Sequence, residues 1–173
     1  LAIRRSALAM LWLAISPLAN AVSVNDWLSE THDGQFHTVD LGECVIENGQ
    51  VIEACRLTFR TYGLLAPDLS NIVLMPTWLN GNAEGLATYN YLGPDGIVDT
   101  DDYFVIAVNA LGNGISSSPS NSAQSSFPAF TIRDQVSLQH QLLTKHLEIE
   151  HLHAVVGASM GGYQTYEWLM MYP

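Results

Sequence analysis

The sequence predicts an α/β fold with a mostly parallel sheet that starts with an antiparallel hairpin. Three compact apolar runs, at residues 71–77, 103–111 and 152–158, have the composition of strands buried on both faces. A hairpin pattern, at residues 40–47 and 51–61, precedes the first of them. Segments with helical spacing follow the apolar runs. Strands and helices that alternate in this way are typical of a parallel sheet covered by helices on both faces.

The composition indicates a folded domain and excludes nucleic acid as a partner. The chain has 173 residues, which suits one domain or part of a larger one, and 48% of them are apolar. Six Lys and Arg residues stand against 17 Asp and Glu residues, and the basic residues form no cluster. Binding to phosphates depends on clustered basic side chains, which this sequence lacks.

Residues 1–21 have the layout of a secretory signal peptide. A pair of arginines precedes an apolar run, and Ala19 and Ala21 form a small-residue cleavage site. The apolar run is shorter than the roughly 20 residues that span a bilayer, so no stable membrane insertion is expected after cleavage. An uncleaved anchor and a buried helix are the alternatives. We therefore expect a periplasmic or secreted protein in which residues 22–39 are a polar lead-in of weak structure.

Cys44 and Cys55 flank the turn of the expected hairpin, and we expect them to form a disulfide. A turn at Gly49-Gln50 places the cysteines opposite each other, whereas a turn at Asn48-Gly49 places them diagonally on one face. Either register permits the bond, and an exported protein would favour the oxidised form. A pair of free thiols is the alternative.

The segments after the hairpin have distinct signatures. Residues 79–93 are a glycine-rich loop that leads into a short helix or an irregular segment. Residues 112–130 are a long loop rich in Gly, Ser and Pro, and loops of this length are usually functional or disordered. Residues 131–147 form the clearest helix, because Thr131 can cap it and Asp134 completes a capping-box pattern.

The third apolar run leads into the sequence "GASMG" at residues 157–161, which matches the G-x-S-x-G pattern of a nucleophile elbow. The pattern lies between the expected strand and an expected helix at residues 160–172. In this context it places the serine on a tight turn that exposes its hydroxyl. We predict that Ser159 is a nucleophile. We also predict that the backbone N–H of Met160 stabilises an oxyanion beside the positive end of the new helix. A tight turn with an inert serine is the alternative.

A second oxyanion donor is expected in the loop after the first apolar run. The sequence "PTWLNGN" at residues 76–82 contains small residues that let backbone N–H groups face the site. Leu79 is the first candidate and Trp78 the second, with a plain strand-to-helix connection as the alternative. No cofactor or metal is expected, because the sequence "LGNGISS" at residues 111–117 departs from the dinucleotide-binding pattern, and the aspartates between residues 95 and 102 lack the spacing of a calcium loop.

Three stretches resemble the homoserine O-acetyltransferase-like branch of the α/β-hydrolase superfamily. They read "FRTYGLLAPDLSNIVL", "LGPDGIVDTDDYFVIAVNALGNGISSSPS" and "FPAFTIRDQVSLQHQLLTKHLEIEHLHAVVGASMGGYQTYEW". The resemblance covers residues 40–173. It implies an α/β-hydrolase fold, with Ser159 as the nucleophile that accepts the acyl group and with the Met160 N–H and the region of Leu79 as the oxyanion hole.

The resemblance also implies that part of the catalytic machinery lies downstream. In this superfamily the catalytic Asp and His follow the elbow, and no histidine follows Ser159 in this chain, which stops after the elbow helix. The lid helices that select the substrate in the family are absent as well. We therefore expect the 173-residue polypeptide alone to have little or no turnover.

The predicted function is acyl transfer from a small-molecule substrate by a serine nucleophile. The signal peptide favours an exported ester or amide hydrolase, because water is always available as the acyl acceptor. Two alternatives stay open at this point. One is a homoserine O-acetyltransferase that uses acetyl-CoA, and the other is a non-catalytic secreted module that has kept the fold.

Overall fold

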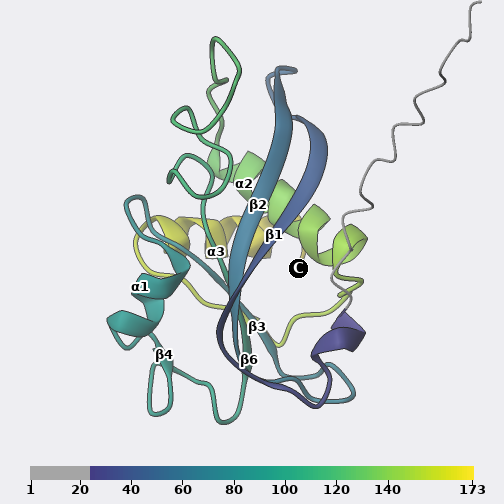
Figure 1. Cartoon of the computed structure of the whole chain (residues 1–173), viewed down its shortest axis with the longest axis vertical. Helices are drawn as coiled ribbons and strands as arrows, with labels where there is room; N and C mark the ends of the chain where they lie inside the picture. Colours follow the sequence, from purple (N-terminus) through teal and green to yellow (C-terminus); the bar gives the residue numbers. More distant parts are fainter. Residues whose placement is uncertain (1–23) are drawn as a thin grey trace, which may run out of the picture.

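The computed structural model describes residues 24–173 (Figure 1). The expected signal peptide, residues 1–21, lies outside the described residues. No helix within residues 24–173 has both the length and the hydrophobicity that crossing a bilayer requires. The elements in chain order are η1 (Val24–Trp27), β1 (Thr31–Val45), β2 (Val51–Leu64), β3 (Ile72–Pro76), α1 (Ala83–Thr88), β4 (Leu92–Gly93), β5 (Val98–Asp99), β6 (Phe104–Val108), α2 (Ile132–Gln141), η2 (Leu142–His146), β7 (Ala154–Val155) and α3 (Met160–Met171).

The central sheet has the strand order β1-β2-β6-β3-β7. The pairs β1–β2 and β2–β6 are antiparallel, whereas β6–β3 and β3–β7 are parallel. The parallel core preceded by an antiparallel hairpin confirms the predicted α/β class. Strands β4 and β5 form a separate small parallel pair next to α1.

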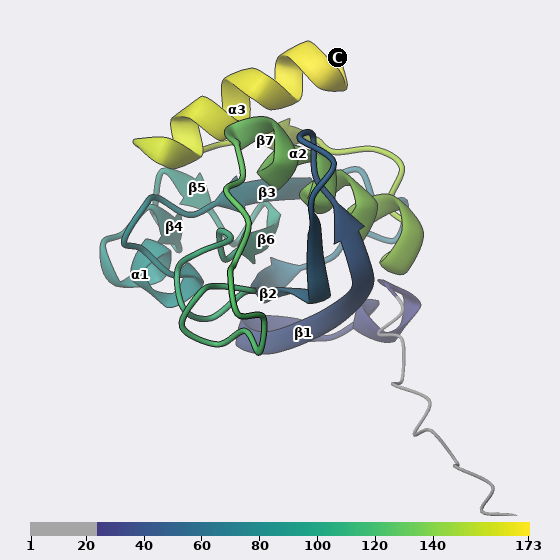
Figure 2. The same cartoon turned by 90° about the horizontal axis from the view of Figure 1, so that it is seen from above.

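The inner strands β3 and β6 are buried on both faces, which explains why they read as continuous apolar runs. Successive side chains of a strand point to opposite faces. In β3, Ile72 and Leu74 therefore join the core under α2 and α3, whereas Val73 and Met75 join a second core with Leu86 of α1. Figure 2 shows α1 on one side of the sheet and α2 on the other.

The prediction of weak structure at residues 22–39 is wrong for the second half of this range, because β1 already begins at Thr31. This half of β1 is polar, and its anchors are side chains that no periodic pattern reveals. His32 Nδ1 and His37 Nε2 both lie within hydrogen-bonding distance of Thr61 Oγ1, at 2.7 and 3.0 Å. Trp27 of η1 packs against both imidazole rings. Burial, and secondarily His32, lower the pKa of His37 to about 4.

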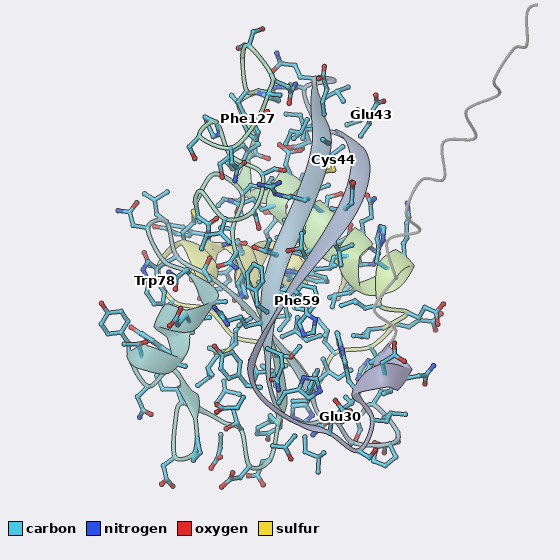
Figure 3. All side chains as sticks on the ribbon, viewed as in Figure 1. Glu30, Glu43, Cys44, Phe59, Trp78 and Phe127 are labelled. Atoms are coloured by element: carbon cyan, nitrogen blue, oxygen red, sulfur yellow. A yellow bond between two sulfur atoms is a disulfide. The ribbon has the colours of Figure 1, made fainter. Side chains whose placement is uncertain are left out.

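Cys44 and Cys55 are joined by a disulfide with a Cα–Cα distance of 5.8 Å, in the half of the long hairpin near its tip (Figure 3). Neither expected two-residue turn is correct. The Ile46 N–H donates to the Gln50 carbonyl at 3.0 Å, so the turn is longer. Irregularities in the β1–β2 ladder then place Cys55 opposite Gly42. A bulge of this kind shifts the register by one residue, which the sequence alone did not reveal.

The helix predicted at residues 131–147 is present as α2, and the π-helical turn η2 continues it. Its capping box is confirmed. The Thr131 side chain accepts the Asp134 N–H at 3.2 Å, and the Asp134 carboxylate accepts the Thr131 N–H at 2.8 Å. The same carboxylate also accepts the N–H of Glu47 at the hairpin tip, at 2.8 Å. The hairpin is therefore tied to the start of α2.

Candidate active site

Ser159 lies between β7 and α3 in a backbone conformation that side chains rarely adopt. Its φ is 55° and its ψ is −121°, and its side chain is exposed. Residues other than glycine with a positive φ of this kind store conformational strain, of about 1–3 kcal/mol. Such strain persists only where the surroundings enforce it. The exposed serine on a strained strand-to-helix turn is the arrangement that a nucleophile elbow requires.

The two glycines around Ser159 are required by close packing. A Cβ atom on Gly157 would collide with the backbone of Gly161 across the turn. A Cβ atom on Gly161 would collide with the carbonyl oxygen of Pro76, the last residue of β3. The backbone of the elbow therefore packs closely both across its own turn and against the end of β3. This packing is the physical reason for the G-x-S-x-G pattern in this chain.

The start of α3 leaves a backbone donor free beside Ser159. The Gly161 N–H donates to the Ala158 carbonyl at 2.9 Å, and the Tyr163 N–H donates to the Ser159 carbonyl at 3.2 Å. Within residues 24–173, the Met160 N–H has no hydrogen-bond partner. It is the first N–H of α3, where the helix dipole favours negative charge. This free N–H fits the predicted oxyanion donor.

The β3–α1 loop, residues 77–82, is held firmly at its first residue. The Thr77 N–H donates to the Val108 carbonyl at 3.1 Å, and Thr77 Oγ1 accepts the Ala110 N–H at 3.0 Å. The Thr77 carbonyl accepts a hydrogen bond from Gln164 Nε2 of α3, at 3.1 Å. All three polar groups of this buried residue are therefore bonded, to two different neighbouring segments.

The second end of the β3–α1 loop is held by asparagines that follow β6. Asn109 Oδ1 accepts the Ala83 N–H at 2.8 Å, and Asn113 Nδ2 donates to the Gly81 carbonyl at 3.3 Å. Sequence reasoning missed the role of Asn109. The available signal was a single amide side chain directly after a strand that is otherwise apolar.

Leu79 lies between these anchors and is the better candidate for the second oxyanion donor. Its side chain is 67% exposed, and its N–H has no hydrogen-bond partner among the described residues. The Trp78 N–H is also unbonded there. However, the Thr77 carbonyl of the same peptide faces α3, so in this trans peptide the Trp78 N–H points the opposite way. Figure 3 shows Trp78 beside α1.

Two of the described histidines pack on tyrosine rings. His140 stacks on Tyr172 with ring centroids 3.8 Å apart, and His153 packs on Tyr103 at 4.9 Å. Within residues 24–173, no histidine forms a hydrogen bond with Ser159. The structure therefore places the elbow, with Ser159 and the free Met160 N–H, against the start of the β3–α1 loop, but no histidine among the described residues is bonded to Ser159.

Two hollows lie near these elements, and neither is lined by Ser159. One, of about 290 Å³, lies between the β3–α1 loop and α1 and includes Trp78 and Tyr89 in its wall. The other, of about 560 Å³, lies between η2, β7 and the second half of α3 and includes His140 and Trp168 in its wall. The larger hollow is thus at the opposite end of α3 from the elbow.

A family model described as "alpha/beta hydrolase fold" matches residues 74–173. The chain is 40% identical over 154 residues to an ethyl acetate hydrolase of Pseudomonas veronii, covering 87% of this chain and 44% of that protein. It is 36% identical over 157 residues to a homoserine O-acetyltransferase of Methanococcoides burtonii, covering 80% and 32%. The solved structure of an acetylester hydrolase from Corynebacterium glutamicum superposes with a TM-score of 0.75 at 42% identity, covering 80% and 41%. The chain spans less than half the length of each of these relatives.

Proposed function

The chain belongs to the α/β-hydrolase fold family, in the branch related to homoserine O-acetyltransferases, and on that premise we propose that it is part of a serine esterase that cleaves short acyl esters. The observation that carries this proposal is the strained, exposed conformation of Ser159 at the start of α3. A φ of 55° on a serine is costly. Strained backbone conformations of this kind cluster at active sites, and the Ser159 strain lies on an exposed turn between a strand and a helix.

In the proposed reaction, the Ser159 oxygen attacks the ester carbonyl and its proton passes to a general base. The carbonyl oxygen becomes an oxyanion, which accepts hydrogen bonds from the N–H groups of Met160 and Leu79. The oxyanion then collapses, the bond to the alcohol breaks, and the alcohol leaves with the proton from the base. Water attacks the resulting acyl-serine in the same manner and releases the acid. We place the base outside the described residues, because no histidine among them is bonded to Ser159.

We favour an ester hydrolase because the chain has higher sequence identity to several ester hydrolases than to the homoserine O-acetyltransferases that it resembles. The chain is about 40% identical to proteins named as an esterase or an ethyl acetate hydrolase, and 36% identical to the homoserine O-acetyltransferase of M. burtonii. Among solved structures, the acetylester hydrolase is 42% identical, whereas a homoserine O-acetyltransferase from Bacillus anthracis is 27% identical. The names of the more similar proteins support acetyl esters of small alcohols as substrates. The transferase stays as the second candidate.

The test uses the complete protein that carries this chain. We expect hydrolysis of p-nitrophenyl acetate and ethyl acetate, labelling by a fluorophosphonate probe, and loss of both in Ser159→Ala. Transfer from acetyl-CoA to homoserine at a higher rate than ester hydrolysis would instead support the transferase. Absence of labelling in a folded wild-type protein would contradict both enzymes and support a non-catalytic module.

We further propose that the protein is exported and that its leader is removed near Ala21. The Cys44–Cys55 disulfide supports this proposal, because disulfides persist mainly in oxidising compartments. The test is N-terminal sequencing and cell fractionation of the protein expressed with a C-terminal tag. A protein that retains residues 1–21 and stays in the reducing cytoplasm would contradict the proposal.

A further inference from the structure

A chain of buried polar side chains connects the core to the candidate active site. Trp168 Nε1 donates to Gln139 Oε1 at 2.8 Å, and Gln139 Nε2 donates to Gln164 Oε1 at 2.6 Å. Gln164 Nε2 then donates to the carbonyl oxygens of Thr77 at 3.1 Å and Met160 at 3.3 Å. Gln139 and Gln164 are 1% and 0% exposed. The helices α2 and α3 thus contribute one glutamine each to a dry contact.

The direction of this chain is dictated by its two ends. An indole N–H can only donate, so it selects the oxygen of the Gln139 amide. The Gln139 nitrogen must then face the oxygen of Gln164. The Gln164 nitrogen is therefore left to face two carbonyls, which can only accept. Neither amide can flip without leaving buried polar atoms unpaired, so Gln164 has one stable orientation.

The two carbonyls that Gln164 binds belong to the two segments of the candidate oxyanion hole. Thr77 opens the β3–α1 loop that contains Leu79, and Met160 carries the other candidate donor. The other bonds of Thr77, to Val108 and Ala110, run to the β6 side of the loop. The Gln164 amide is thus the hydrogen-bonded link from the start of this loop to α3.

We propose that Gln164 is a positioning residue that sets the separation of the two oxyanion donors, with Gln139 fixing its orientation. This inference rests on the proposed serine esterase function. Removal of the amide leaves the Thr77 carbonyl unpaired in a dry site and frees the loop to move relative to Met160. Displacement of an oxyanion donor lowers stabilisation of the transition state more than it lowers binding of the ester.

The experiment compares Gln164→Met with Thr165→Val in the complete protein. Thr165 is the next residue on α3, and its hydroxyl bonds only within the helix, to the Gly161 carbonyl at 3.0 Å. For p-nitrophenyl acetate, we expect Gln164→Met to lower kcat about 10- to 100-fold with KM changed less than about threefold. We expect Thr165→Val to change kcat less than about twofold, at a similar or smaller loss of thermal stability.

Inhibition by an aryl trifluoromethyl ketone distinguishes a positioning role of Gln164 from a general loss of protein stability. The Ser159 oxygen adds to the ketone carbonyl, which becomes an oxyanion held by the same N–H groups. We expect the inhibition constant to rise in Gln164→Met by about the factor by which kcat falls, and to stay unchanged in Thr165→Val. If Gln164→Met does not fold, Gln139→Met gives the same comparison, because it frees Gln164 from its orienting partner.

The outcomes distinguish this inference from the function on which it rests. A wild-type protein that neither turns over esters nor labels at Ser159 overturns both. An active wild type with a kcat for Gln164→Met, or for Gln139→Met in its place, within about twofold of wild type overturns the positioning role alone. Equal losses in Gln164→Met and Thr165→Val, without a change in the inhibition constant, also overturn it.

Discussion

Ser159→Gly should stabilise the protein relative to Ser159→Ala, because the strain at the elbow belongs to the side chain. Both variants lack the hydroxyl, so both are inactive under the proposed mechanism and differ only in the Cβ atom. Relief of the strained φ of 55° is worth about 1–3 kcal/mol. The greater freedom of glycine in the unfolded chain offsets about 0.5–1 kcal/mol of this gain. The expected net gain for Ser159→Gly over Ser159→Ala is about 1 kcal/mol.

The assay is urea unfolding of both variants, with Ser137→Gly and Ser137→Ala as the matched pair. Ser137 is exposed in the interior of α2, where glycine is less favourable than alanine by about 1 kcal/mol. The sign of the glycine effect should therefore reverse between the two sites. If glycine is also the less stable residue at position 159, the elbow stores no strain and the reasoning is refuted.

Two further predictions concern stability. Replacement of Cys44 and Cys55 by Ala, or reduction of the disulfide, should lower the free energy of unfolding by about 3 kcal/mol. This is the value expected when a disulfide closes a loop with a sequence separation of 11. An unchanged urea midpoint in the double variant would contradict this prediction. His37→Gln should flatten the fall in stability between about pH 6.5 and pH 4. Burial and His32 lower the folded-state pKa of His37 to about 4, so between these values the unfolded chain takes up a proton that the folded protein does not. Parallel stability–pH curves for wild type and His37→Gln would show that another group is responsible.

The parts of the fold that the sequence predicted well are those with local signatures. The apolar runs of β3 and β6 and the capping box at Thr131 and Asp134 can each be recognised within about ten residues of sequence. The first half of β1 could not, because its stabilising contacts run from His32 and His37 to Thr61 on another strand. A polar edge strand has no periodic apolar pattern of its own.

The candidate site shows the same division. The roles of Ser159 and Met160 were predicted from a five-residue pattern in its strand-to-helix context. The role of Gln164 was not predicted, because its partners Thr77 and Gln139 are 87 and 25 residues away in the chain. No local rule connects two amides at such separations.

By itself, the sequence determined the α/β class and the serine on a turn between a strand and a helix, because burial patterns and turn chemistry act between near neighbours. Only the tertiary structure decided how that turn is used. The close approach of Gly161 to the Pro76 carbonyl holds the elbow in its strained form. The bonds of Thr77 to three separate residues fix the start of the loop in which, among the described residues, the Leu79 N–H has no partner. These constraints come from segments that are far apart in the chain and meet only when the sheet and its helices pack. No local stretch of the sequence contains both partners of any of these contacts.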